Sequence, residues 1–422
     1  MSTSNLKTAA SLTKRETIVS IAIIALMFFI FGFLSWINAI LIPYFKMAFE
    51  LTHFQSYLVA FAFYIAYFVM SVPSSYLLKA VGFKKGMMVG FMALALGTFI
   101  FVPAAMTSTY GLFLLGLFTI GVGLAILQTA ANPYITILGP KERAAQRISI
   151  MGICNKFAGI VAPLLFAAAV LRPGDTDSVE LERVIVPYAV VSVTMLLIGI
   201  GVRYSPLPEI DTDKEEGEVA ETNSSKTSIF QFPHLVLGAV AIFIHVGAQI
   251  ISIDTIISYA GSMGLSLTEA KVFPSYTLAM AIVGYFVGIS LIPRYISQTN
   301  MLRLVTILGA VLSLLIVFMK GEVTFLGHSV DVSIWFIVLL GLSNSLTWAG
   351  IWPLALDGLG RFTKVGASLL IMGLCGNAIM PMVYGYFADV YGLREAYWVL
   401  FPLYLYLVYY AVSGHKVRKW GF

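Results

Sequence analysis

The sequence predicts an all-α membrane protein of twelve transmembrane helices, built as two six-helix bundles that are related by a pseudo-two-fold axis. Three observations carry this prediction. Of the 422 residues, 59% are hydrophobic and only 11% are charged, whereas soluble domains carry roughly 25% charged residues. The apolar residues form long runs separated by short breaks of Gly, Pro and charge, as expected where a chain leaves lipid. In addition, the second half of the chain repeats the first.

The repeat appears as a nearly constant offset between short equivalent segments. The matched pairs are residues 51–52 with 267–268 and Asn38 with Asp254 at an offset of 216, and residues 151–154 with 372–375 at an offset of 221. An apolar chain that consists of two parallel copies is typical of secondary transporters, in which the binding site lies between the copies near the membrane midplane. Asp254 therefore stands out, because it is an acid where the other copy has an amide.

Each span is placed on an apolar run of about 20 residues, the length that crosses a bilayer. The predicted spans are residues 19–45, 54–78, 86–105, 110–137, 148–170, 185–203, 234–260, 272–293, 302–319, 333–356, 365–387 and 396–413. A polar stretch with the acidic run 211–218 separates the sixth span from the seventh. We therefore expect an N-terminal bundle (1–204), a flexible cytoplasmic linker (205–231) and a C-terminal bundle (232–422).

The distribution of basic residues predicts the orientation. If both termini are cytoplasmic, nineteen of the 26 lysines and arginines lie on the cytoplasmic side and six on the other, as the positive-inside rule requires. The net charge of +5 is thereby explained, and no basic patch is left for nucleic acid. We expect a monomer in the bacterial cytoplasmic membrane, surrounded by lipid.

Polar residues inside the spans are the candidates for a site, because each costs several kcal/mol in lipid unless it faces a cavity or a partner. Candidate sugar-binding residues are Asn38, Gln128, Asn155, Gln249, Asp254 and Trp352. Amides bond hydroxyl groups in fixed directions and tryptophan rings stack on the C–H face of a sugar, so this set favours a polyhydroxyl ligand. Asn132, Lys156, His245 and Asp357 each have a structural explanation that competes with a functional one.

Three longer segments resemble the fucose–proton symporter family of the major facilitator superfamily. Residues 29–43 resemble its first helix, residues 127–134 its fourth and residues 352–366 its tenth, and residues 246–257 are most similar to the seventh helix of its glucose/galactose branch. The loops 74–85 and 291–298 are similar to the gating loops of the superfamily. The resemblance implies the major facilitator fold and uptake of a hexose by alternating access.

The sequence departs from the family at two positions that the resemblance links to proton coupling. Fucose symporters have an Asp in the first helix and a Glu in the fourth, where this chain has Ala39 and Gln128. Neither can titrate, which leaves Asp254 as the acid of the central region. We predict that Asp254 supports ion coupling to Na⁺, with Ser252 and Thr255 as further oxygen ligands; coupling to H⁺ is the alternative.

No catalytic triad, acid pair, phosphate-binding loop or metal-ligand spacing is evident in the sequence, so we expect no enzyme activity, no cofactor and no metal site. Cys154 and Cys375 are expected to be buried and unbridged. A drug–proton antiporter and a non-translocating sugar sensor are the two rival functions. Glucose, galactose, mannose and N-acetylglucosamine all remain open as substrates.

Overall fold

The computed structural model describes residues 13–137, 144–172, 180–205, 207, 227–292, 294–359 and 362–420. The first half contains α1 (Lys14–Trp36), α2 (Asn38–Ala48), α3 (His53–Ser56), α4 (Leu58–Val81), α5 (Phe83–Met106), α6 (Tyr110–Ile137), α7 (Ala144–Val170) and α8 (Ile185–Tyr204). The second half contains α10 (Pro233–Asp254), α11 (Ile256–Gly261), α12 (Leu267–Ala270), α13 (Phe273–Leu291), α14 (Gln298–Phe318), β1 (Glu322–Phe325), β2 (His328–Asp331), α15 (Ser333–Ser345), α16 (Thr347–Leu356), α17 (Thr363–Met372), α18 (Gly376–Tyr391) and α19 (Leu400–Val412). Short 3₁₀ turns, among them η8 (Gly373–Cys375) and η9 (Glu395–Val399), link some of these helices.

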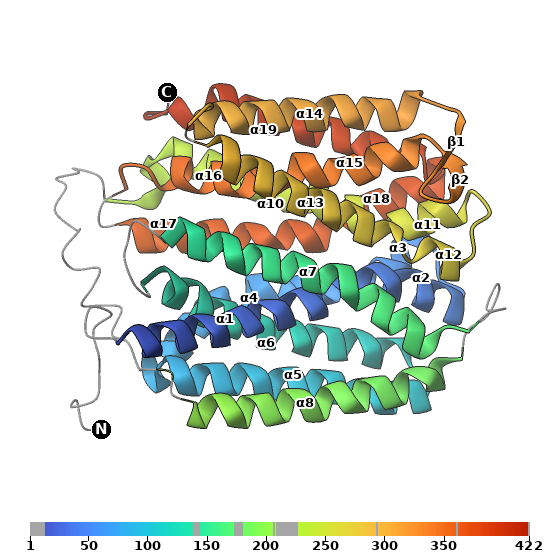
Figure 1. Ribbon diagram of the computed structural model, residues 1–422, viewed down its shortest axis with the longest axis horizontal. Coiled ribbons are helices and arrows are strands. Elements are labelled where there is room, and N and C mark those ends of the chain that lie inside the picture. The colour runs from blue at the N-terminus through green and yellow to red at the C-terminus, as the bar shows by residue number, and fades with distance from the viewer. Residues whose placement is uncertain are drawn as a thin grey trace.

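The predicted spans correspond to the helices of the structure. Eleven helical segments of the described chain are long and apolar enough to cross a membrane, and a shorter apolar segment, Leu58–Ser74, lies within α4. Each falls on one of the twelve predicted spans. Figure 1 shows that the start of α1 and the end of α19 lie at the same end of the molecule, here called the terminal end. The other end is called the opposite end.

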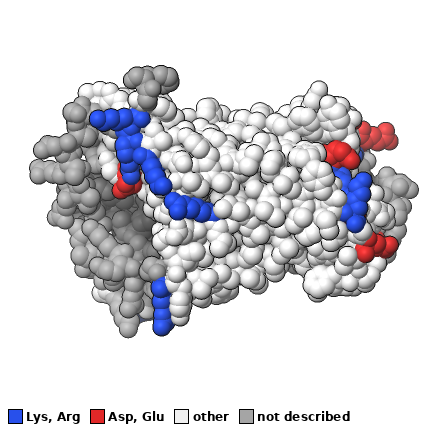
Figure 2. Space-filling model, turned by 90° about the horizontal axis from the view of Figure 1, so that it is seen from above, with Lys and Arg blue, Asp and Glu red and all other residues white. Residues whose placement is uncertain are grey.

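On the face of the molecule shown in Figure 2, charged side chains are absent from the middle of the surface. On the face shown in Figure 2, lysines, arginines and acidic residues gather toward the two ends and leave a middle band without charge. Such a band is what a hydrocarbon layer requires, because an exposed charge there would lose its hydration.

The helix pairs that pack most closely lie within each half of the chain. These pairs are α5 with α6, α5 with α8, α4 with α6 and α1 with α7 in the first half, and α13 with α15, α10 with α18, α14 with α15 and α14 with α19 in the second. In Figure 1 the blue and green helices of the first half lie below the yellow and red helices of the second. The halves meet most extensively where α4 packs against α18 and α7 packs against α13, and smaller contacts join α3 to α18, α4 to α17, and α2 to α10 and α11.

The repeat is visible in the structure as a pair of helix caps, at positions slightly different from the sequence match. Thr52 and Gln55 form a capping box at the start of α3, and Ser266 and Glu269 form one at the start of α12. The sequence offset had paired Thr52 with Thr268, two residues beyond this cap. The side chain that accepts the N-terminal N–H defines the equivalent position, and this position belongs to Ser266.

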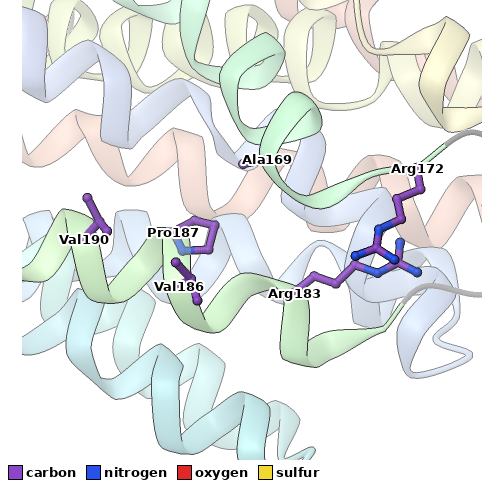
Figure 3. Close-up of a pocket in the computed structure, with 6 residues that line it drawn as sticks. All are labelled: Ala169, Arg172, Arg183, Val186, Pro187 and Val190. Atoms are coloured by element: carbon purple, nitrogen blue, oxygen red, sulfur yellow. The ribbon is translucent and has the colours of Figure 1, made fainter.

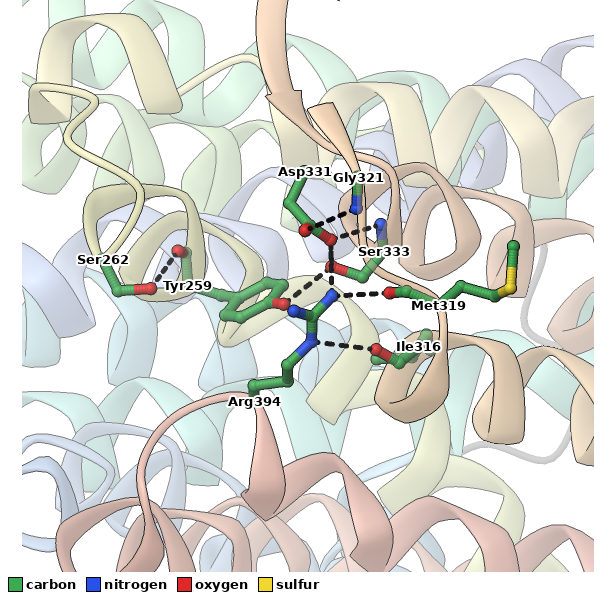
Figure 4. A network of polar contacts seen from close by, with 8 residues as sticks. All are labelled: Tyr259, Ser262, Ile316, Met319, Gly321, Asp331, Ser333 and Arg394. Atoms are coloured by element: carbon green, nitrogen blue, oxygen red, sulfur yellow. Dashed lines mark hydrogen bonds and ion pairs between the residues drawn. The ribbon is translucent and has the colours of Figure 1, made fainter. Parts of the chain in front are cut away.

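The β-hairpin of β1 and β2 lies at the opposite end and is held by a partly buried ion pair between Arg394 and Asp331. Arg394 Nη2 lies 2.5 Å from Asp331 Oδ1 and donates to the Met319 carbonyl at 2.7 Å. Ser333 donates to the same carboxylate through its backbone N–H and its hydroxyl, at 3.0 and 2.6 Å (Figure 4). Partial burial raises the pKa of Asp331, but these hydrogen bonds and the Arg394 charge outweigh it and hold the pKa below the ordinary value. This network anchors the hairpin between α14 and α15.

The expected linker falls mostly outside the described residues, which include only 205, 207 and 227–231 of it. The boundaries 1–204 and 232–422 therefore stay a prediction.

Candidate functional site

Two helix breaks place the central polar side chains. Ile37 separates α1 from α2, so that Asn38 begins α2, and Thr255 separates α10 from α11, so that Asp254 ends α10. In the offset of 216 the two break residues differ by two positions, so the two halves are interrupted at nearly the same place. Interrupted membrane helices free backbone groups and commonly line binding sites.

Asn38 and Asp254 are both fully buried. Within the part of the chain that the structure describes, neither the amide of Asn38 nor either oxygen of Asp254 has a hydrogen-bond partner. α2 packs directly against α10 and α11, so these two side chains lie on neighbouring elements from opposite halves. A buried polar group without a partner costs about 1–3 kcal/mol, and two such groups in one region mark a place where a ligand is expected.

Three tyrosines, Tyr57 at the N-cap of α4 and Tyr64 and Tyr67 within it, connect this pair to the first half. Tyr57 and Tyr64 both lie in the neighbourhood of Asp254, and the Tyr64 hydroxyl also lies near Asn38. The Tyr64 and Tyr67 rings are stacked with centroids 6.2 Å apart. Sequence analysis missed these tyrosines, although their spacing of seven and three residues places all of them on one helical face.

Gln128 extends the row of tyrosines. Gln128 lies on α6, and its Nε2 atom donates a hydrogen bond to the Tyr67 hydroxyl at 2.8 Å. The polar side chains that gather along α4 are therefore Gln128, Tyr67, Tyr64, Asn38 and Asp254, and we call these five residues together with Tyr57 the central row. Every member can donate or accept a hydrogen bond, as a sugar hydroxyl requires.

Asn155 and Lys156 lie on α7 beside Trp36. The Trp36 Nε1 donates to Asn155 Oδ1 at 3.1 Å, and Asn155 Nδ2 donates to the Phe28 carbonyl at 3.3 Å. The Lys156 ammonium is 4.0 Å from the centroid of the Trp36 ring, a cation–π distance. Asn155 thus already has two partners, unlike Asn38.

Lys156 is not the partner of Asp254. Among the described residues no ion pair joins them; the Lys156 ammonium lies over the Trp36 ring instead. The structural alternative in which a Lys156 salt bridge neutralises Asp254 is therefore absent from this conformation.

The hydroxyls expected beside Asp254 bond elsewhere. Ser252 Oγ donates to the Gln249 carbonyl at 2.7 Å, and Thr255 Oγ1 bonds the Ile251 carbonyl and the Tyr397 hydroxyl at 2.7 Å each. Neither bonds the Asp254 carboxyl. Successive helical residues point about 100° apart, so residues 252, 254 and 255 do not converge on one point.

No hydrogen bond among the described residues joins the remaining candidates to the central row. Trp352 is stacked on Trp348 with ring centroids 5.2 Å apart, and Gln249 is half-buried on α10. Asp357 pairs with Arg418 and its carbonyl accepts from His234 at 2.8 Å, which supports a capping role at the terminal end. The side chain of Asn132 falls outside the described residues.

Neither cysteine of the chain forms a disulfide. Cys154 and Cys375 are free, although both are half-buried where full burial was expected. Among the described residues, no three His, Cys, Asp or Glu side chains are grouped to hold a metal ion.

An open groove on the outer surface does not belong to the site. It is lined by Ala169, Arg172, Arg183, Val186, Pro187 and Val190 from α7, α8 and the chain between them (Figure 3). Val186 and Val190 are largely exposed, so the groove lies on the outer surface of α8, and none of its residues belongs to the central row.

Taken together, two related sets of membrane-spanning helices with a buried polar row between them define a transporter. Residues 24–374 match the family model of the Major Facilitator Superfamily, and the chain belongs to this family. This membership also confirms that the protein is a multi-pass membrane transporter and not an enzyme.

Three individual transporters are similar to this chain over most of its length. The chain is 35% identical to the glucose/galactose transporter of Brucella abortus biovar 1 (strain 9-941) over 399 residues, which cover 93% of each protein. It is 28% identical to the L-fucose-proton symporter of Escherichia coli (strain K12), over 90% of this chain and 89% of that one. Among solved structures, it is similar to the Major Facilitator Superfamily transporter FucP in the outward conformation, with a TM-score of 0.68, 27% identity and coverage of 94% and 99%. The predicted resemblance is confirmed.

Proposed function

We propose that this protein imports a hexose-type sugar, glucose or galactose in the first place, together with a proton. The observation that carries the proposal is the pair Asn38 and Asp254, fully buried and without partners among the described residues. A carboxyl group enclosed in a membrane protein must either hold a proton or be neutralised by a ligand. Such a group can link uptake of a proton to binding of a polar solute.

A sugar fits the chemistry of the central row. Its amides and phenols each offer a donor and an acceptor and come from the first half, and the carboxyl group of Asp254 is contributed by α10 of the second half, so both halves would contact a ligand. The names of the relatives, glucose/galactose transporter and L-fucose-proton symporter, support the same class of substrate.

A proton suits this site better than the Na⁺ expected from sequence. A sodium ion needs several oxygen ligands, and the hydroxyls of Ser252 and Thr255 are engaged away from Asp254. A proton needs one carboxyl group. The comparison with proton symporters favours H⁺ as well, although Asp254 occupies a different helix from the acids that the family resemblance implies.

The proposed cycle is alternating access, with bundles 1–204 and 232–422 rocking about the central row as a monomer in the bacterial cytoplasmic membrane. The terminal end faces the cytoplasm in this proposal, in keeping with the excess of basic residues there.

The test is uptake by the purified protein in liposomes. A panel of labelled glucose, galactose, mannose, N-acetylglucosamine and fucose is offered under a pH gradient, a Na⁺ gradient or neither. We expect accumulation of at least one hexose that is driven by the pH gradient alone. Accumulation driven only by Na⁺ would restore the sodium hypothesis, and efflux of lipophilic cations without sugar uptake would favour the drug–proton antiporter. Sugar binding without counterflow would identify a sensor.

A further inference from the structure

A carboxylate of the second half bonds the first half at the opposite end of the molecule. Asp389 lies near the end of α18, and its two oxygens accept hydrogen bonds from the backbone N–H groups of His53 at 2.8 Å and Phe54 at 2.9 Å. These are the first N–H groups of α3, which have no acceptor within their own helix. Bonds from N–H groups to a carboxylate are stronger than bonds between neutral groups.

The chain is adapted to let these two segments meet. A Cβ atom at Gly385, one helical turn before Asp389, would lie 2.5 Å from the ring of Tyr57 and 3.1 Å from the His53 carbonyl. Any larger residue would push α18 away from the start of α4. The Tyr57 ring also packs edge-on against Tyr384, with centroids 5.8 Å apart. Because Tyr57 belongs to the central row, this packing closes the row on the side of the opposite end.

The surrounding charges favour the contact but leave it reversible. Lys46 Nζ lies 3.0 Å from His53 Nε2 and attracts Asp389. The Asp389 side chain is exposed, so water can take over its hydrogen bonds when the segments separate. An exposed contact of this kind shifts an equilibrium by a modest amount and does not lock it.

The second interface between the halves has no counterpart of this contact. The repeat offset of 221 matches Asp389 with Ala168, which has no carboxylate. Between α7 and α13 the halves instead meet through close packing, where a Cβ at Gly159 would lie 2.8 Å from Leu278, and through a bond from Ser275 Oγ to the Ile160 carbonyl at 2.8 Å. One interface thus has a polar contact at its outer edge, and the other is packed along its length.

We propose that Asp389 is a latch that holds the transport pathway closed at the opposite end, and that opening begins by parting α3 and α4 from α18 while α7 and α13 act as the pivot. This inference rests on the alternating-access cycle proposed above. Release of the latch exposes the central row to the side from which sugar enters.

Pulsed electron paramagnetic resonance on the full chain tests the latch without any sugar. Cys154 and Cys375 are first changed to serine, and spin labels are placed on Ser108→Cys and Lys320→Cys, exposed sites at the opposite end in different halves. In Asp389→Ala we expect the ratio of long to short distances to rise about ten-fold, the effect of losing about 1.4 kcal/mol. Gly385→Ala should raise the ratio as well, because its methyl group separates the same segments.

The control is Glu322→Ala, which removes an exposed carboxylate of β1 from the same end without touching α3. It should leave the distances unchanged. If Asp389→Ala proves too unstable to purify, Asp389→Asn, which keeps one acceptor oxygen, should give a smaller shift in the same direction. An unchanged distribution in the Asp389 variant that folds overturns the latch.

Sugar uptake separates this inference from the proposed function. Normal pH-driven uptake with unchanged distances in the variants refutes the latch alone. If the wild-type protein transports no sugar while the Asp389 variant still shifts the distances, the sugar assignment is refuted and the latch stands.

Discussion

The helix breaks beside Asn38 and Asp254 lie at similar places in the two halves but carry different side chains. Both interrupt the first helix of a half, both side chains are fully buried, and both lack partners among the described residues. One is an amide that keeps the same charge at every pH, and the other is an acid that can lose a proton. Of these two positions, only the one in the second half carries an acid.

The difference between the amide and the acid distinguishes a residue that can only bind sugar from one that can also couple transport to a proton. An amide offers a donor and an acceptor to a sugar but cannot carry a proton across the membrane. A carboxyl group can do both, since its protonation changes the cost of burying it. The comparison predicts that Asp254 and Asn38 contribute to different steps, and the following changes test this from the largest expected effect to the smallest.

Asp254→Asn makes the two breaks chemically alike and should abolish accumulation. One proton moving through ~100 mV supplies about 2.3 kcal/mol, which supports a roughly forty-fold gradient of sugar. In the variant, the inside-to-outside ratio of labelled sugar in liposomes should fall to one, while exchange of sugar for sugar persists. Asp357→Asn, an exposed acid at the terminal end, is the control. Full accumulation in Asp254→Asn would exclude this carboxyl group from coupling.

Exchanging the amide of Asn38 and the acid of Asp254 tests whether the two helix breaks are interchangeable. If the breaks are equivalent, Asn38→Asp combined with Asp254→Asn should recover accumulation of about ten-fold, because a titratable group returns to the buried centre. The measurement is the same uptake assay, with Asp254→Asn as the reference. Failure of the double variant to exceed that reference would mean that the site of the acid, and not only its presence, matters.

Gln128→Ala should weaken binding more than Asn155→Ala does. Gln128 belongs to the central row and bonds only Tyr67 there, so its loss leaves a sugar hydroxyl and a phenol unpaired at about 1–3 kcal/mol. We expect ten-fold weaker binding or more by calorimetry. Asn155 already bonds Trp36 and Phe28, so its removal should act through the position of Trp36. Equal losses in both variants would contradict this ranking.

Asp331, unlike Asp254, is a carboxylate with hydrogen-bond and ion-pair partners in the structure. Its lowered pKa means that the charged form stabilises the fold above the ordinary value of 3.8, and that this contribution disappears as the pH falls below 3.8 through the lowered pKa. Asp331→Asn should therefore cost about 1–3 kcal/mol at neutral pH and little at the lowest pH. Thermal unfolding followed by intrinsic fluorescence at several pH values measures this difference. A loss independent of pH would show that shape rather than charge holds the hairpin.

Sequence reasoning succeeded where hydrophobic length decides the outcome. The spans follow from apolar runs, which are local features. The pairing of Asn38 with Asp254 stays a prediction, because the helix caps at Thr52 and Ser266 differ from that offset by two residues. It was less successful for side-chain partners. The tyrosines of α4 were missed because aromatic residues in a span are usually packing or interface residues. The sodium ligands Ser252 and Thr255, chosen because they are close to Asp254 in sequence, point elsewhere because a helix turns by about 100° per residue.

The sequence by itself determined that this chain spans a membrane in two related halves and that an acid occupies one of two positions that the repeat pairs, because burying about 20 apolar residues per helix in lipid leaves no other arrangement for the backbone. Only the tertiary structure decided which polar groups meet: that Tyr57 and Tyr64 face Asp254, that Lys156 lies on Trp36, and that Asp389 reaches His53 and Phe54 from 335 positions or more away. The reason is physical. Membrane insertion depends on composition along the chain, whereas a hydrogen bond depends on distance and angle between segments that only packing brings together.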